Sequence, residues 1–141
     1  METIEFRILE EQFPTGLHSS IAPFLSGVPL AALLRKVELP AARRRGDPSL
    51  AGWYAGLTGT GICWPSRYYL GEPAAGSGTV LLGCTCGEAG CWPFSAVVRV
   101  EDDTVTWSDY RHGFLDADYR ELRPFTFDRR QYEDAVRATA D

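Results

Sequence analysis

The chain has 141 residues, of which 45% are hydrophobic and 23% charged, and its formal net charge is −5. This length and composition are typical of one globular domain, so we expect a single domain over 1–141. The acidic balance argues against binding to nucleic acid or to an anionic membrane surface. No apolar run approaches the roughly 20 residues that a membrane-spanning helix needs. We see no secretory signal at the start of the chain and expect a cytoplasmic protein.

Two strands are expected near the N-terminus. The alternation of polar and apolar residues over 3–9 predicts a half-buried strand with Ile8 on its buried face. We expect a loop over 10–19, where Pro and Gly interrupt the pattern. A short strand over 20–25 should follow, and Pro23 should confine it to the edge of a sheet because proline lacks a backbone N–H.

The next element is a helix that begins at Pro29 and that Pro40 should end. Its apolar stripe at helical spacing consists of Leu30, Leu33, Leu34 and Val37. The basic residues 43–45 should lie in a charged surface loop.

A long irregular connection is expected from Leu50 to Gly78, because glycines and prolines punctuate it. The part from Trp53 to Tyr69 is rich in aromatic side chains and should cover a sheet edge or line a cleft. A loop of this length inside one domain is either functional or hides a further element.

The second half of the chain contains the strongest patterns. Strands are expected over 79–84, 95–101 and 104–110, with a turn at 101–103 that joins the last two. A C-terminal helix should run from about 129 to 138. Its predicted N-cap is Asp128, with Gln131 three residues later and a hydrophobic staple between Phe127 and Tyr132. The sequence thus predicts the α+β class, with a mainly antiparallel, twisted sheet of about five strands and two helices on one face.

Three of the four cysteines gather around a glycine-containing segment, 87–90. Cys84 and Cys86 precede this segment and Cys91 follows it, whereas Cys63 lies in the long connection. Without a secretory signal, a permanent disulfide is not the expected state of these thiols.

A hairpin would bring these cysteines together. If the strand that starts at Thr79 continues to Cys86 and the next starts at Trp92, residues 87–90 form the hairpin loop. Cys86 and Cys91 would then be opposed, with Cβ atoms about 4.5–5.5 Å apart. That separation would let them share a metal ion or, after a small shift, form a disulfide.

Three interpretations of this cluster remain open. Cys84 and Cys86 could be small core residues that continue an apolar strand face. Alternatively, Cys84, Cys86 and Cys91 could bind a structural metal, for which zinc is the expected ion. A fourth ligand would then come from Cys63, His112 or His18. The third interpretation is a reactive thiol, although no neighbouring cation or histidine in the sequence would lower its pKa.

Other catalytic signals are weak. The end of the strand over 104–110 carries Asp109, and His112 follows closely, so an enzyme could use both side chains in one pocket. The glycine-rich stretch 56–61 lacks the strand–turn–helix context of a dinucleotide fingerprint.

The cysteine motif also resembles one in a family of small bacterial proteins. The resemblance lies mainly in the segment Leu81-Leu82-Gly83-Cys84-Thr85-Cys86-Gly87-Glu88-Ala89-Gly90-Cys91-Trp92-Pro93. Weaker matches occur over 33–40, 105–110 and 127–133. The resemblance implies a stand-alone domain and assigns no activity, fold or ligand.

The pattern as a whole favours a non-catalytic binding or interaction module, because aromatic side chains are abundant in the expected loops and acid–base pairs are not. Its partner would be another protein or a second copy of the chain. A zinc- or thiol-dependent protein built on the three clustered cysteines is the first alternative, and an enzyme using Asp109 and His112 is the second.

Overall fold

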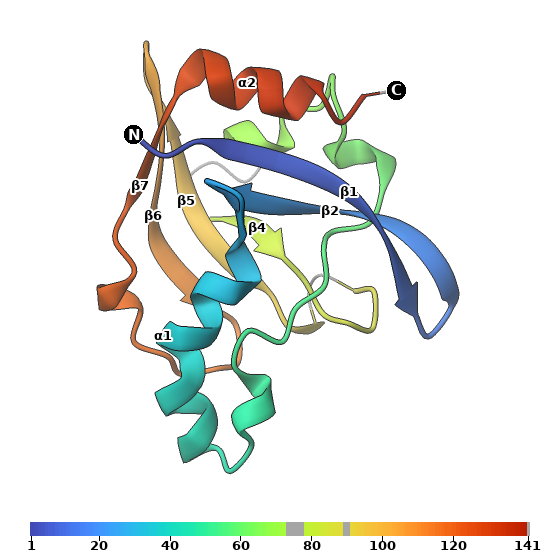
Figure 1. Ribbon diagram of the computed structural model, residues 1–141, viewed down its shortest axis with the longest axis vertical. Coiled ribbons are helices and arrows are strands. Elements are labelled where there is room, and N and C mark those ends of the chain that lie inside the picture. The colour runs from blue at the N-terminus through green and yellow to red at the C-terminus, as the bar shows by residue number, and fades with distance from the viewer. Residues whose placement is uncertain (73–77, 89–90, 141) are drawn as a thin grey trace.

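The expected α+β class is confirmed. The computed structural model describes residues 1–72, 78–88 and 91–140. Over these residues the chain forms two α-helices and two antiparallel sheets, of three and four strands (Figure 1). The expected single sheet of about five strands is therefore wrong. The helices lie at opposite ends of the molecule (Figure 1), and not on one face of a sheet.

The first sheet is built on a long hairpin. β1 (Ile4–Phe13) and β2 (Gly16–Leu25) pair along their whole length. The loop expected over 10–19 is therefore wrong. Gly16 closes the tight turn with a φ of 126°, a conformation that L side chains rarely adopt. Because most side chains near the turn are exposed, the local sequence lacks the apolar alternation of a half-buried strand.

Pro23 lies in the middle strand of this sheet, which corrects the edge position expected for it. β3 (Val28–Pro29) pairs with β2 only at Phe24 and Leu25. Ile21 uses the same side of β2 to pair with Leu57. Since backbone groups two residues apart face the same side of a strand, the ring nitrogen of Pro23 faces the gap between these two pairings. Its missing N–H therefore costs no ladder hydrogen bond.

The second sheet has the order β4-β5-β6-β7. Its strands are β4 (Thr79–Leu82), β5 (Phe94–Val100), β6 (Thr104–His112) and β7 (Phe125–Asp128). The predicted pairing of β5 with β6 and the turn between them are confirmed. β7 was not predicted. Asp109 has a φ of 50° where the register between β5 and β6 shifts, so it occupies a β-bulge.

Isolated β-bridges link the two sheets, directly at Glu2 and through the long connection at Ala55 and Leu57. Glu2, just before β1, pairs with Phe127 of β7. On the other side, Leu57 pairs with Ile21 of β2, and Ala55 pairs with Gly83 just after β4. Apart from such bridges and short 3-10 turns, the described part of the connection over 50–72 is irregular, as predicted. This connection therefore links the sheets, and the main core lies between them.

Helix α1 (Leu30–Arg44) continues past Pro40, which was expected to end it. Pro40 is exposed, so water can reach the carbonyl that its missing N–H leaves unpaired. The last turn is held by the burial of Ala41 and Ala42 and by a hydrogen bond from Arg44 to the carbonyl of Asp116. These tertiary contacts outweigh the local effect of the proline.

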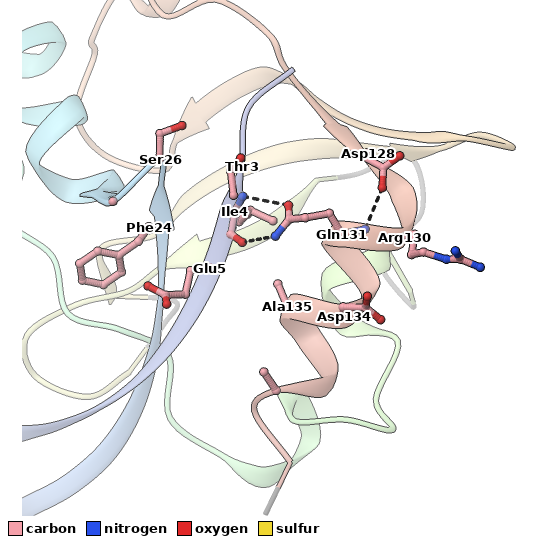
Figure 2. A pocket seen from close by; sticks show the side chains of 12 residues that line it. Thr3, Ile4, Glu5, Phe24, Ser26, Asp128, Arg130, Gln131, Asp134 and Ala135 are labelled. Carbon is pink, nitrogen blue, oxygen red and sulfur yellow. Dashed lines mark hydrogen bonds between the residues drawn. The ribbon is translucent and has the colours of Figure 1, made fainter.

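Helix α2 (Arg129–Arg137) begins as predicted. The Asp128 carboxylate accepts a hydrogen bond from the backbone N–H of Gln131 at 2.9 Å, and the rings of Phe127 and Tyr132 lie 5.4 Å apart. The Gln131 side chain binds the backbone N–H and C=O of Ile4 instead of completing a capping box (Figure 2). Through these bonds the helix is attached to the start of β1.

A short chain of hydrogen bonds crosses the main core. The Nε1–H of the fully buried Trp107 donates to the Tyr132 hydroxyl at 3.1 Å. That hydroxyl donates to the backbone carbonyl of Tyr69 at 2.6 Å. The Tyr132 hydroxyl therefore provides a hydrogen-bond partner both for the Trp107 N–H of β6 and for the Tyr69 carbonyl of the long connection. Buried polar groups need such partners.

Tyr132→Phe should destabilise the protein by about 1–3 kcal/mol, because it leaves the Trp107 N–H and the Tyr69 carbonyl buried and unpaired. Urea denaturation monitored by tryptophan fluorescence measures this loss. The matched control is Tyr68→Phe, whose hydroxyl bonds to the Val80 carbonyl from a half-buried position and should cost less. Equal losses in the two variants would contradict this role of Tyr132.

Candidate functional site

The cysteines lie on a turn that starts earlier than the sequence suggested. β4 ends at Leu82, before the expected end at Cys84, so the condition that the strand continue to Cys86 is not met. The chain instead turns after Cys84, where the backbone N–H of Gly87 donates to the Cys84 carbonyl at 3.0 Å. Gly87 has a φ of 98°, which favours glycine. The bridge between Gly83 and Ala55 ends the sheet immediately before the turn.

The turn brings three thiols together. The Sγ atoms of Cys84, Cys86 and Cys91 all lie within 4.8 Å of one another, close enough to bind one metal ion. A tetrahedral zinc ion with Zn–S bonds of about 2.3 Å holds its sulfurs about 3.8 Å apart, so a small closure of the group would suffice. The backbone N–H of Cys86 donates to Cys84 Sγ at 3.3 Å, an amide-to-sulfur bond of the kind that supports metal-bound thiolates.

The three thiols differ in burial. Cys84 is 4% exposed and packs in a small apolar cluster with Ala41, Trp92 and Leu115. Cys86 and Cys91 are exposed. The core interpretation therefore holds for Cys84 and is wrong for Cys86.

The thiols also differ in acidity. The pKa of Cys86 is lowered, first by a hydrogen bond from the backbone of Glu88 and then by one from Cys84. The pKa of Cys91 is raised to about 12, because its thiol donates to Cys84 and Cys86 and would lose these bonds on ionisation. Cys86 is thus the first of this pair to become a thiolate. The turn itself supplies the stabilisation, which the sequence had not suggested.

Neither Cys63 nor His112 belongs to the group of close ligand atoms among the described residues. Cys63 is half-buried and lines a separate hollow with Leu57, Thr139 and Ile8. Ile8 was expected on a buried face, but it is 46% exposed at this hollow. His18 lies on the β1–β2 hairpin and is also outside the group.

His112 organises the chain after β6. Its Nδ1 accepts hydrogen bonds from the backbone N–H groups of Phe114 and Leu115, at 2.9 and 2.8 Å, which places the ring proton on Nε2. Burial, and secondarily the charge of Arg45, lower the pKa of His112 to about 4. A histidine with this pKa and an occupied Nδ1 is a poor general base near neutral pH.

Asp109 and His112 do not line the same hollow in the described structure. His112 lies with Phe114 and Asp116, whereas Asp109 lies in the adjacent hollow with Asp118 and Arg120. The enzyme hypothesis required both side chains in one pocket, and this arrangement does not support it.

Aromatic rings pack around Trp92, the residue that follows Cys91. The Trp92 ring lies 4.3 Å from the His112 ring and 5.7 Å from Trp53, and it stacks on Phe114 at 6.3 Å, measured between centroids. Trp53 and Phe114 are 41% and 57% exposed. In the described structure, Trp92 Nε1 and His112 Nε2 are buried and have no hydrogen-bond partner. We call the three rings of Trp53, Trp92 and Phe114 the aromatic wall.

A buried carboxylate holds the loops behind this wall. Glu38 of α1 has no solvent exposure. It accepts hydrogen bonds from the backbone N–H of Gly52 at 2.9 Å, from the Tyr119 hydroxyl at 2.7 Å, and from the Tyr54 hydroxyl. Burial raises the pKa of Glu38, although these three bonds oppose the shift. Burial, together with the nearby carboxyl group, also raises the pKa of both tyrosines, which therefore remain donors.

The sequence analysis missed this network. Glu38 follows Leu34 by four residues and lies on the apolar side of α1, so a buried carboxylate could have been suspected from its spacing. Its partners Tyr54 and Tyr119 are distant in the sequence and occur in segments without a periodic pattern.

Another hollow lies away from the cysteines, between the start of β1 and helix α2 (Figure 2). Glu5, Asp128, Arg130 and Asp134 supply charged side chains around it. It contains no cysteine or histidine among its described lining residues.

Searches against protein-family models, curated proteins and solved structures gave no match to this chain. The resemblance of the cysteine motif to small bacterial proteins therefore stays a prediction. Neither α1 nor α2, the helices of the described residues, is long and apolar enough to cross a membrane.

Glu38→Gln should change how stability depends on pH. Because the folded state raises the pKa of Glu38 above its ordinary 4.5, the corresponding stabilisation is complete below about pH 4.5 and is lost as the pH rises through the raised value. The neutral glutamine avoids this loss. The Tm of the variant relative to the parent protein should therefore increase from pH 4.5 towards neutrality. Thermal melts over this range test the expectation, with the exposed Glu121→Gln as control, and a constant difference would contradict it.

Gly87→Ala should strain the cysteine turn. The added Cβ would lie 3.5 Å from the Phe13 ring, an ordinary contact, so the cost comes from the φ of 98°. We expect a loss of about 1–2 kcal/mol in unfolding free energy. Urea denaturation measures it. Gly61→Ala is the control, because Gly61 has no positive φ and nothing within 4 Å of the added Cβ. If both variants lose stability equally, the turn does not require glycine at position 87.

Proposed function

We propose that this protein is a zinc-binding interaction module in which Cys84, Cys86 and Cys91 bind one zinc ion. The observation that carries the proposal is the mutual proximity of their Sγ atoms, within 4.8 Å. Thiolates are the ligands that zinc prefers in structural sites, and the separation needs only a small adjustment for tetrahedral binding. Zinc is the ion expected in a thiolate site that does no redox chemistry.

The protonation of the three thiols supports this proposal. In the metal-free protein, the thiols share hydrogen bonds, and the pKa of Cys91 is raised because its proton makes two of them. A metal ion at the centre of the group would replace these protons and stabilise all three thiolates. The pKa of Cys86 is lowered and that of Cys91 is raised, so Cys86 gives up its proton more readily than Cys91.

The zinc ion would fix the turn relative to the core. Cys84 belongs to a buried cluster, whereas Cys86 and Cys91 lie on the exposed part of the turn. The ion would therefore connect a surface segment to the core through bonds stronger than the packing of a few side chains. Two rings of the aromatic wall, those of Trp53 and Phe114, are exposed next to Trp92, and exposed aromatic rings are common anchors of protein interfaces. A protein partner or a second copy of the chain is the expected binding partner.

Native mass spectrometry of protein purified without chelator tests the proposal. We expect one zinc ion per chain, and four alkylated cysteines after denaturation. Cys86→Ser and Cys91→Ser should each reduce bound zinc at least tenfold, and a chelator should lower the Tm of the parent protein to that of these variants. Cys63→Ser is the matched control and should retain the ion, because Cys63 lies outside the group.

The outcomes separate zinc binding from thiol chemistry. A metal-free chain whose Cys86 and Cys91 variants melt like the parent protein would contradict the proposal. A metal-free chain in which Cys86 and Cys91 resist alkylation until a reductant is added would favour the thiol-dependent alternative. The lowered pKa of Cys86 is the observation behind that alternative.

A further inference from the structure

We infer that the metal site built on Cys84, Cys86 and Cys91 keeps its fourth coordination position open, and that this position takes the thiolate of a small-molecule thiol. The inference rests on the proposed function, because it requires a metal ion at the three cysteines. It goes further in naming the chemical class of an external ligand. It also distinguishes this site from a closed structural site with four protein ligands.

The chain supplies three ligands to the site. Among the described residues, no fourth His, Cys, Asp or Glu has its ligand atom within 4.8 Å of the three sulfurs. Of the residues that the structure does not describe, 73–77 and 89–90 contain only Pro, Ala, Gly and Ser, and the remaining one is the terminal Asp141. His112 offers no ring nitrogen to the ion, because two backbone N–H groups occupy its Nδ1 and the ring proton therefore lies on Nε2. A tetrahedral ion at this site must therefore complete its shell from outside the described chain.

The burial of the three ligands indicates which side is open. Cys84 is 4% exposed and approaches from the core, next to Trp92 and Leu115. Cys86 and Cys91 are exposed. An ion between these three sulfurs has protein behind it and solvent in front, so an external ligand can reach the fourth position without any rearrangement of the core.

The donor set of the site favours a soft ligand. Three thiolates around a divalent ion leave a net charge of −1 before a fourth ligand binds. Such an electron-rich ion polarises bound water less than an ion held by neutral histidines does, so a hydrolytic role is disfavoured. Sulfur donors, in contrast, suit a thiolate-bound ion. The exchange is balanced: water leaves the metal, the thiol loses its S–H proton to solvent, and its sulfur forms the new bond.

The aromatic wall suits a small organic ligand at this position. Trp92 directly follows Cys91 in the chain and packs in the same cluster as Cys84. Trp53 and Phe114 are both partly exposed, and their rings pack against Trp92. Carbon atoms of a bound thiol could therefore pack against aromatic rings, which water as the fourth ligand could not exploit.

Cobalt(II) substitution provides the test, because cobalt reports its thiolate ligands through sulfur-to-metal charge-transfer absorption. The protein would be loaded with one cobalt ion and titrated with 2-mercaptoethanol. We expect a saturable increase of about one-third in the charge-transfer intensity, since three thiolates become four. Ethylene glycol, the oxygen analogue, should cause no such change. Cys63→Ser should behave like the parent protein, because Cys63 is not a ligand.

The other outcomes overturn either the proposed function or only this inference. Failure to bind cobalt or zinc would remove the proposed function itself. Bound cobalt with a spectrum that the thiol does not change would show a closed fourth position and overturn only this inference. Removal of cobalt from the protein by the thiol, measured as cobalt in the filtrate, would also overturn only this inference. A cobalt-dependent dimer that 2-mercaptoethanol does not alter would show that a second copy fills the position.

Discussion

The buried carboxylate of Glu38 is the interaction on which the arrangement of the site depends. It binds the backbone of Gly52 and the hydroxyl of Tyr54, and so fixes the start of the long connection against α1. The next residue, Ala55, exchanges two backbone hydrogen bonds of 3.0 Å with Gly83, which immediately precedes Cys84. One side chain of a helix is therefore connected to the start of the cysteine turn through two short steps.

Burying a carboxyl group at this position costs free energy, and the hydrogen bonds that it accepts are the reason for its presence. Burial of a carboxyl group is unfavourable, and its raised pKa reflects that cost. An apolar residue at this position would avoid the cost but could not accept three hydrogen bonds from segments that lack regular structure. Tyr54 also packs against Phe94 and His112, and Tyr119 packs against Phe94. The carboxylate thus orders loops that have few other constraints, and these loops form the back of the aromatic wall.

The sequence predicted those elements whose signals are local. Asp128 and Gln131 define the start of α2 within four residues, and the β5–β6 pair follows from alternation and a short turn. The continuation of α1 past Pro40 and the partners of Glu38 could not be predicted, because the contacts that hold them come from residues far away in the chain. The cysteine cluster was predictable only in part. Its close spacing predicts neighbouring sulfurs in either a hairpin or a tighter turn, so the group was predictable although the turn was not.

The exposure of the thiols provides the final argument for a ligand. Cys84 fills a place in a core cluster that another small apolar residue could also occupy, so packing alone explains it. Packing does not explain Cys86 and Cys91, which are exposed on a turn and contribute no core contacts. What all three share is the position of their sulfur atoms and the hydrogen bonds between them. The metal ion proposed above would account for the buried and the exposed members together, because it would need one firm attachment to the core and ligands that can close around it from the surface.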